Sequence, residues 1–202
     1  MLTRRTLLTY SAAATALFAT GNWTSAWAQS ASDPTGFVLQ LGNALVAIVN
    51  GPGTYEDKKR RLAPLIEEAV DVDGIARFCL GRFWRTASAG QQQQFGQLFH
   101  SVLLNNITGK LGQFEGVTFK PTTTTQREGD SLVGTTIRRP NQQPNNVQWV
   151  VSQATGRPKI VDVVAEGTSL RLTQRSDYAA YIARNNNDVD ALISAMRHQL
   201  AA

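Results

Sequence analysis

The spacing of apolar residues changes from a helical period to a strand period near Val117, and the helical period returns after Gly167. Between these points lie four strand-like runs, VTFKPTTTT, SLVGTTIRR, NVQWVVSQ and PKIVDVVAEG. The short segments REGD, PNQQPN and ATGR separate the runs and are rich in turn residues. Connections this short favour antiparallel neighbours. The sequence therefore predicts an α+β domain, with a four-stranded antiparallel meander between two groups of helices.

Helices are predicted before the meander by apolar spacing and by residues typical of helix ends. Asp33-Pro34 resembles a cap followed by proline in the first turn, and NGPG at 50–53 ends that helix. The charged segment after it is expected to be helical, with Pro64 causing a kink or a break into two short helices. Another short helix is expected to begin near Asp71.

The longest amphipathic pattern follows the stretch LGRFWRTASAGQQQQ. Ser88 is a plausible N-cap, and the glutamines after it are good helix formers rather than a disordered tract. Because a helix with one apolar face normally covers a sheet, we expect this helix to cover the meander. After the meander, two further helices are expected, split near residues 185–188. The apolar face of the long helix consists of Phe95, Leu98, Phe99, Val102, Leu103 and Ile107.

Residues 1–28 are typical of a cleaved export signal. Arg4 and Arg5 form a basic start, an apolar run follows, and the tripeptide AWA ends at Ala28. A membrane anchor is the alternative, but polar residues interrupt the apolar run well short of the roughly 20 residues that a spanning helix needs. The paired arginines fit a twin-arginine signal, and the general secretory route is also open. We therefore expect residues 29–202 to form a single domain in the periplasm.

The size and composition of the chain are those of a protein with a sizeable core. A chain of this length can bury about 70% of its unfolded surface, so it needs no metal or disulfide for its core. The only cysteine, Cys79, cannot form an intramolecular disulfide and is expected to be a small buried apolar residue. The net charge of +5 slightly favours anionic partners such as membrane surfaces, and no basic helix or RNA-binding motif points to nucleic acid. The basic run at 58–61 is either a solvated face or a docking surface for acidic partners.

Few residues in the sequence are suited to catalysis or metal binding. The two histidines, His100 and His198, are far apart, and there is no HExxH motif, cysteine pair, GxSxG elbow, GxGxxG loop or Walker loop. We therefore expect no catalytic residues, no metal and no cofactor. Asp162 stands out because it lies in the apolar strand KIVDVVAEG. It could be a general base in a pocket, or it could anchor Arg171, Arg175 or a nearby backbone donor, and we favour the anchor.

Two segments, DVDGIARFCLGRFWRTASAGQQQQFGQLFHSVL and VDVVAEGTSLRLTQRSDYAAYIARNNNDVDALISAMR, resemble the periplasmic phospholipid carriers of the Mla pathway. This MlaC family, also called the toluene-tolerance family, includes a hopanoid-associated branch. The similarity extends over about residues 34–200. Where the family usually has Ser/Thr-Pro-Glu-Gln at the start of the long helix, this chain has Ser-Ala-Gly-Gln from Ser88, which bears on the lipid carried. The most specific matches are Leu80, Gly81, Gln91, Phe95, Phe99, Asp162, Glu166, Gly167, Ser169, Gln174 and Arg175.

The resemblance implies an NTF2-like sheet whose apolar cavity holds the acyl chains of a lipid while the headgroup faces water. It implies transport rather than catalysis, by a monomer that carries phospholipid or a hopanoid-type lipid between the outer and inner membranes in a system for outer-membrane asymmetry. The implied partners are an outer-membrane lipoprotein complex and an inner-membrane ABC transporter with a hexameric lipid-receiving subunit. Structural roles are implied for Asp162, Glu166, Gly167 and Arg175. The predicted lipid-binding residues are Phe83, Trp84, Phe95, Phe99, Leu103, Val133, Ile137, Trp149, Val151 and Val163.

Two other functions are compatible with the same sequence. An NTF2-like pocket could host an isomerase or dehydratase that uses Asp162, since such chemistry needs little more than one carboxylate in an apolar cavity. The chain could also be a periplasmic adaptor whose apolar surface binds protein rather than lipid. The resemblance favours the lipid carrier.

Overall fold

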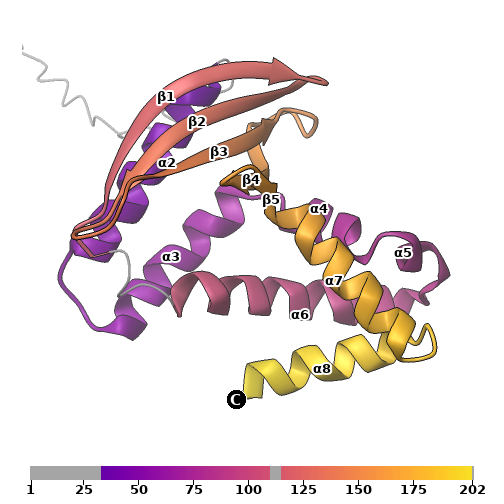
Figure 1. Cartoon of the computed structure of the whole chain (residues 1–202). Coiled ribbons are helices and arrows are strands. Elements are labelled where there is room, and N and C mark those ends of the chain that lie inside the picture. Colours follow the sequence, from indigo (N-terminus) through magenta and orange to yellow (C-terminus); the bar gives the residue numbers. More distant parts are fainter. Residues whose placement is uncertain (1–32, 110–114, 202) are drawn as a thin grey trace, which may run out of the picture.

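The computed structural model describes residues 33–109 and 115–201, so the predicted export signal at 1–28 lies outside the described residues. The helices are α2 (Pro34–Asn50), α3 (Tyr55–Ala69), α4 (Val72–Leu80), α5 (Arg82–Thr86), α6 (Ala89–Thr108), α7 (Leu170–Arg184) and α8 (Val189–Ala201). The strands are β1 (Thr118–Arg127), β2 (Asp130–Arg138), β3 (Asn145–Ser152), β4 (Lys159–Ala165) and β5 (Thr168–Ser169). Figure 1 shows the sheet and α2 at one end of the molecule and α6 and α8 at the other, with α3 and α7 running between them.

The described strands form one antiparallel sheet in the order β1-β2-β3-β4-β5. This order confirms the predicted α+β fold and meander, but the sheet has a fifth strand that the prediction lacks. Glu166 and Gly167 reverse the chain between β4 and β5 with φ of 52° and 79°. A two-residue turn of type I′ requires positive φ at both central residues. Because β5 has only two residues, it has no alternation of apolar and polar side chains from which a strand could be predicted.

Helix α3 is continuous through Pro64, so the predicted break into two short helices is wrong. It begins with a capping box in which Thr54 and Asp57 each accept from the other's backbone N–H, and hydrogen bonds from Thr54 lower the pKa of Asp57. Pro64 is exposed, whereas Leu62 and Ile66 on either side of it are buried. Burial of two such side chains contributes about 3–6 kcal/mol. An internal proline costs about 3 kcal/mol, so burial of the apolar face keeps the helix intact.

Local capping signals place the starts of α4 and α6 where they are predicted. Asp71 accepts from the backbone N–H of Gly74 at 3.0 Å, and Ser88 forms a capping box with Gln91. The predicted position of α6 over the sheet is wrong. The helix packs mainly against α4 and α8, while α2 packs on β1 and β2. Apolar spacing marks which side of a helix is buried but does not say what covers it.

The buried apolar residues form two large clusters, and partly buried Val70 packs against both. The first, which we call the helical core, consists of Val72, Ala76, Cys79, Leu80, Phe83, Ala87, Phe95, Phe99, Val102, Tyr178, Ile182, Val189, Leu192, Ile193 and Met196. The second, which we call the sheet core, consists of Phe37, Val38, Leu41, Ala69, Val133, Val151 and Ile160.

Candidate functional site

The inner face of the sheet, which α2 covers, is apolar along three neighbouring strands. Val133 of β2 lies opposite Trp149 of β3, and Thr135 lies opposite Val147. Trp149 in turn lies opposite Val163 of β4. Since alternate residues of a strand point to the same face, these pairings form one continuous face across β2, β3 and β4.

Trp149 is oriented on this face by a hydrogen bond and a ring contact. Its indole Nε1–H donates to Thr135 Oγ1 at 2.9 Å, and that hydroxyl donates to the carbonyl oxygen of Val147 at 3.2 Å. The Trp149 ring lies edge-on to that of Phe119, with ring centroids 6.0 Å apart. Trp149, Phe119 and Val163 are only partly buried. On this face, partly exposed apolar side chains therefore lie beside the fully buried Val133 and Val151.

The residues predicted to line a lipid cavity fall into two groups. Those on helices include Phe95 and Phe99, whose rings lie edge-on to Tyr178 with centroid distances of 5.8 and 6.4 Å. The helical group, in or against the helical core, is Phe83, Trp84, Phe95, Phe99 and Leu103. The strand group is Val133, Ile137, Trp149, Val151 and Val163.

Helix α2 supplies side chains to the sheet face that the prediction omits. Phe37, Val38 and Leu41 are buried against Val133 and Val151 in the sheet core. The helical spacing of these α2 residues is visible in the sequence, and it predicts an apolar face. Because that face has no sequence signal for its partner, its position on the sheet could not be predicted.

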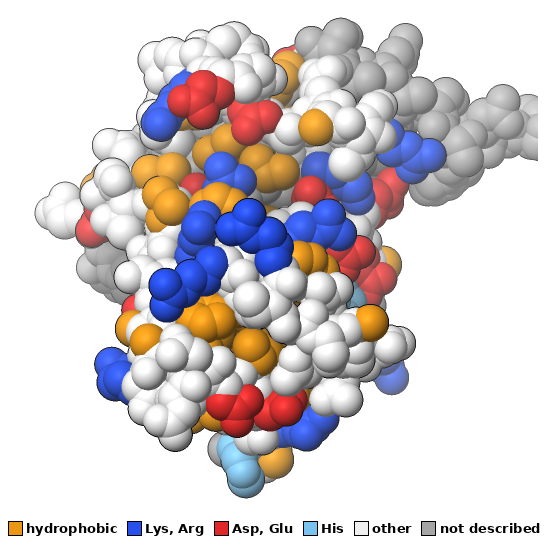
Figure 2. All heavy atoms as spheres, turned by 90° about the vertical axis from the view of Figure 1, so that its right-hand side faces the viewer, with side chains coloured by type: hydrophobic (Ala, Val, Ile, Leu, Met, Phe, Trp, Pro, Cys, Tyr) orange, Lys and Arg blue, Asp and Glu red, His pale blue; other side chains and the backbone are white. Residues whose placement is uncertain are grey.

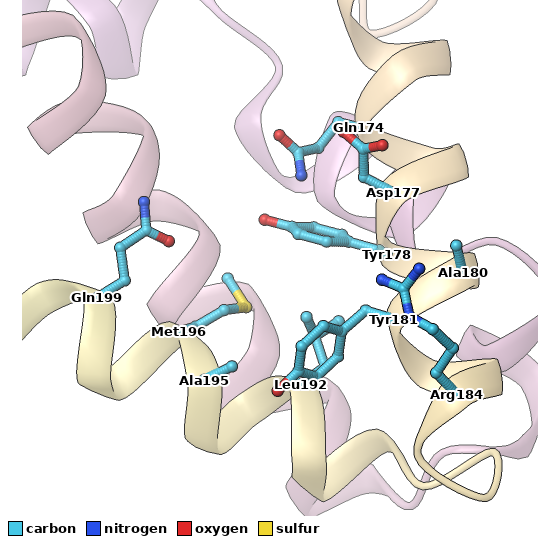
Figure 3. A pocket seen from close by; sticks show the side chains of 10 residues that line it. All are labelled: Gln174, Asp177, Tyr178, Ala180, Tyr181, Arg184, Leu192, Ala195, Met196 and Gln199. Atoms are coloured by element: carbon cyan, nitrogen blue, oxygen red, sulfur yellow. The ribbon is translucent and has the colours of Figure 1, made fainter.

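Two cavities lie on the helical side of the molecule. The first, of about 380 Å³, lies between α7 and α8, and Figure 3 shows Tyr178 and Met196 pointing into it beside the polar Asp177. The second, of about 450 Å³, is lined by residues of α4, α5 and α6 that include Arg77 and Trp84. Their volumes are in the range of about 300–1,000 Å³ that is usual for ligand pockets. Their charged linings are unsuited to long acyl chains, because burying a charge against hydrocarbon is costly.

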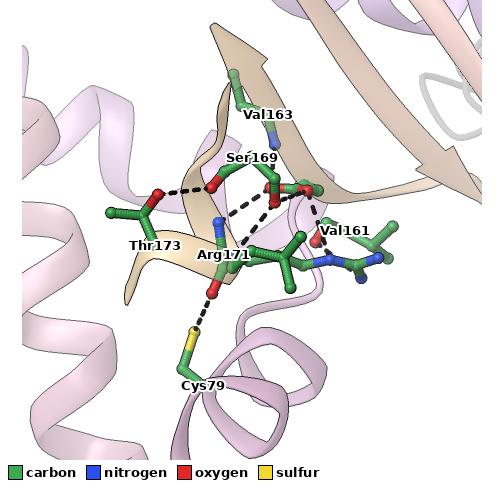
Figure 4. Close-up of polar contacts among 8 residues, drawn as sticks. Cys79, Val161, Val163, Ser169, Arg171 and Thr173 are labelled. Atoms are coloured by element: carbon green, nitrogen blue, oxygen red, sulfur yellow. Dashed lines mark hydrogen bonds and ion pairs between the residues drawn. The ribbon is translucent and has the colours of Figure 1, made fainter. Parts of the chain in front are cut away.

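Asp162 is buried, and its carboxylate accepts hydrogen bonds from Val163, Ser169 and Arg171, which are labelled in Figure 4. Oδ1 accepts from the backbone N–H groups of Val163 and Arg171 at 2.8 and 3.1 Å, and Oδ2 accepts from the Ser169 hydroxyl at 2.5 Å. Arg171 Nε lies 3.5 Å from Oδ2 as an ion pair without hydrogen-bond geometry, and Arg171 Nη1 donates to the carbonyl oxygen of Val161. These contacts confirm the prediction that Asp162 is an anchor between the last long strand and the helix after it.

The turn at Glu166 and Gly167 brings the anchor's partners into place. It sets Ser169 opposite Val164 in the β4–β5 pairing, seven residues after Asp162. Ser169 also caps α7, because its hydroxyl oxygen accepts from the backbone N–H of Leu172. Ser169 thus both caps α7 and donates a hydrogen bond to the Asp162 carboxylate.

The two segments that carry the family resemblance meet at Gly81, between α4 and α5. Gly81 has φ of 59° and ψ of −128°, and a Cβ atom there would lie 3.0 Å from Arg175 Nε. The guanidinium of Arg175 stacks on Phe78 rather than pairing with Asp162. Buried Cys79 donates from Sγ to the carbonyl oxygen of Arg171 at 3.6 Å, and burial raises the pKa of Cys79 to about 12. We call this region the α4–α7 junction, formed by Phe78, Cys79, Gly81, Asp162, Ser169, Arg171 and Arg175.

In the part of the chain that the structure describes, no three His, Cys, Asp or Glu side chains lie together as a metal site would need. His100 lies 3.4 Å from a carboxylate oxygen of Glu67. No described helix is long and apolar enough to cross a bilayer.

The geometry defines an α+β domain with a long apolar sheet face and a buried carboxylate used as an anchor. The family model described as "MlaC protein" matches residues 40–198. Because this match spans most of the sequence, the chain belongs to the MlaC family, as the resemblance of its motifs predicts.

Two individual proteins are similar to the chain. Toluene tolerance protein ttg2D of Pseudomonas putida is 26% identical over 150 residues, which are 73% of this chain and 67% of that protein. A solved structure from Ralstonia solanacearum, described as a phospholipid-binding protein in complex with a phospholipid, matches with a TM-score of 0.75 and 22% identity. That match covers 85% of this chain and 100% of the other, and it shows that the two share a fold.

Proposed function

We propose that this chain is a lipid-binding carrier that moves phospholipid, or a hopanoid-type lipid, through the periplasm between the outer and inner membranes. Membership of the MlaC family supports the carrier, and the fold is shared with a protein described as phospholipid-binding. The proposed partners are an inner-membrane ABC transporter with a hexameric lipid-receiving subunit and an outer-membrane lipoprotein complex. The export signal predicted at residues 1–28 supports the periplasmic location.

The separation of the apolar side chains into two cores is the observation that supports lipid binding best. The sheet core and the helical core are distinct clusters, and Val70 packs against both. Parting them would expose apolar surface on two sides, and acyl chains would cover that surface again. Each buried CH₂ group contributes about 0.8 kcal/mol. A pair of acyl chains can therefore offset the cost of the opening, and the two walls keep them from water.

Each group of predicted residues then forms one wall of the lipid site. The partly buried edge at Trp149 and Val163 gives acyl chains a point of entry, while the headgroup stays in water. The strand wall is Val133, Ile137, Trp149, Val151 and Val163, and the helical wall is Phe83, Trp84, Phe95, Phe99 and Leu103.

The direct test is the lipid content of the protein. It is purified without detergent from the periplasm of an expression host and extracted with organic solvent, and the extract is analysed by mass spectrometry. We expect stoichiometric diacyl lipid, and preparation from the native host will show whether a hopanoid-type lipid is preferred. Protein that contains no lipid and acquires none from liposomes would contradict the carrier and favour a protein-binding adaptor.

Substitutions on the two faces of β3 test the site. Trp149→Asp places a charge on the inner face and should abolish lipid loading, whereas Gln148→Asp places the same charge on the opposite, exposed face and should not. Val133→Arg tests the buried centre of the same wall. Circular dichroism checks that the variants are folded. Normal lipid content in folded Trp149→Asp and Val133→Arg would show that the lining is assigned wrongly.

The contacts of Asp162 argue against the enzyme alternative. A general base needs a lone pair that substrate can reach, whereas this buried carboxylate accepts two hydrogen bonds at Oδ1 and one at Oδ2, where it also pairs with Arg171. Asp162→Asn separates the two functions, because it would abolish turnover in an isomerase or dehydratase. In a carrier it changes mainly the stability and leaves the lipid content intact.

A further inference from the structure

Four arginines gather on one face of the molecule, over α4, α5 and the start of α7. Figure 2 looks onto this face and shows Lys and Arg side chains close together near its centre, with hydrophobic side chains on either side. The segments that supply these arginines, residues 74–86 and 167–176, contain no Asp or Glu. The acidic residues adjacent to them along the chain are Glu166, Asp177 and Asp73, and Asp73 lines a cavity with Arg77. The four are Arg77, Arg82, Arg171 and Arg175.

Two of these arginines share one aromatic ring. The guanidinium carbons of Arg171 and Arg175 lie 4.6 and 5.0 Å from the centroid of the Phe78 ring. Gly81 has no side chain, so Arg175 can lie directly against the backbone there. Arg171 is already paired with the buried Asp162, and none of the ion pairs in the described residues involves Arg175, so the charge that an anion would neutralise at this ring is that of Arg175.

The other two arginines extend the positive charge onto α4 and α5. Arg77 stacks on Trp84 at 5.3 Å and Arg82 stacks on Phe83 at 4.8 Å. None of the ion pairs found in the part of the chain that the structure describes involves Arg77, Arg82 or Arg175. Their charges are ordered by stacking and are available to an anionic partner.

Exposed leucines lie beside the arginine pair on α7. Leu170 and Leu172 are 52% and 56% exposed, more than any other large apolar side chain in the described residues. At about 100° per residue, Arg171 and Arg175 lie between the two leucines around the helix axis. Apolar side chains next to cations are typical of helices that lie in the interface of a membrane.

We propose that this arginine-leucine face, formed by Arg77, Arg82, Leu170, Arg171, Leu172 and Arg175, docks on the surface of an anionic phospholipid bilayer. The guanidinium groups of Arg77, Arg82 and Arg175 pair with lipid phosphates, and the two leucines enter the headgroup region. A bilayer fits this face better than an acidic protein does. Its phosphates can bind the arginines, and its headgroup region can also accept the two exposed leucines beside them. Arg171, Arg175 and the two leucines lie outside the residues proposed to bind cargo, whereas Arg77 and Arg82 stack on Trp84 and Phe83 of the helical wall, so cargo is measured alongside docking.

Flotation of the purified protein with vesicles tests the proposal. We expect it to float with phosphatidylcholine vesicles that contain phosphatidylglycerol and not with phosphatidylcholine alone. High salt should release it, since the Debye length falls from about 10 Å at 0.1 M to about 3 Å at 1 M. Arg82→Gln/Arg175→Gln should weaken binding about 25-fold, because each basic residue near an anionic surface contributes roughly fivefold. Leu170→Ser/Leu172→Ser should also weaken it.

Matched variants separate docking on the bilayer from a general effect of charge and from loss of the bound lipid. Lys59→Gln/Arg61→Gln removes the same charge from α3 and should leave flotation unchanged. Arg77→Gln/Arg82→Gln repeats the test and leaves intact the stacking of Arg171 and Arg175 on Phe78. Cargo measured by mass spectrometry should stay the same in Leu170→Ser/Leu172→Ser, which changes no residue of either lipid wall, so loss of docking is distinguishable from loss of lipid carriage. Absence of flotation with anionic vesicles, equal loss in the α3 control, or binding to polyglutamate but not to vesicles would overturn the proposal.

Discussion

The α4–α7 junction and the sheet core stabilise the same chain by different means. In the junction, Asp162, Ser169 and Arg171 are joined by hydrogen bonds and an ion pair, and Gly81 has a backbone conformation suited to glycine. In the sheet core, apolar side chains pack together. Hydrogen bonds need each atom in place, whereas apolar contacts can be exchanged for contacts with another apolar group. The junction is thus suited to a fixed role and the sheet core to accepting acyl chains.

Removal of the Asp162 carboxylate should have the largest effect on stability. Asp162→Ala leaves the Arg171 guanidinium and two backbone N–H groups without their acceptor. Loss of one partner of a buried pair costs about 3–5 kcal/mol, and we expect about 3 kcal/mol because the Arg171 side chain is 29% exposed. Urea unfolding measures the change, with exposed Asp177→Ala as the control. A loss below about 1 kcal/mol would show that the junction is not the stabilising region.

Gly81 and Gly167 both have positive φ, and comparing them separates the cost of backbone strain from the cost of a steric contact. Gly81→Ala should lower the free energy of unfolding by about 2–3 kcal/mol, because the new Cβ adds a close contact with Arg175 to an unfavourable backbone conformation. At Gly167 a Cβ would meet nothing within 4 Å, so Gly167→Ala should cost only about 1 kcal/mol. Equal losses in thermal or urea unfolding would mean that the contact with Arg175 does not matter.

Stability should also depend on alkaline pH through Cys79 in the junction. Burial raises its pKa from 9.0 to about 12, so its contribution is fully present below about pH 9 and is lost as the pH rises toward 12. At about pH 10 the expected loss is about 1 kcal/mol, since the unfolded thiol ionises while the folded one does not. Burial raises the pKa of Tyr178 as well, with the same sign at higher pH. Unfolding at neutral and alkaline pH should show a smaller decline for Cys79→Ala, and identical declines would contradict the assignment.

The smallest effect is expected in the sheet core. Trp149→Phe removes the hydrogen bond to Thr135 but keeps an apolar ring, and Thr135 still donates to the carbonyl oxygen of Val147. We expect a loss of about 1 kcal/mol in urea unfolding and unchanged lipid content by mass spectrometry. If this variant loses its lipid while it remains folded, the indole N–H rather than apolar contact holds the cargo, and the comparison between the two regions fails.

Local signals account for the features that can be predicted from the sequence. Asp71 and Ser88 mark helix starts because their side chains accept from nearby backbone N–H groups. The split between α7 and α8 contains Asn186 and Asn187, whose φ values of 58° and 59° asparagine tolerates well. The alternation around Trp149 specifies which face of β3 is apolar. Each of these depends on a few neighbouring residues.

Long-range contacts account for the rest. The sequence by itself determined the order of the elements, most of their ends, which of their faces are apolar, and the family to which the chain belongs. Only the tertiary structure decided that α2 rather than α6 covers the sheet, that α3 continues through Pro64, and that Arg175 stacks on Phe78 instead of pairing with Asp162. The reason is that periodicity and capping are set by neighbours along the chain, whereas the partner of a face or a charge depends on the packing of segments far apart in sequence.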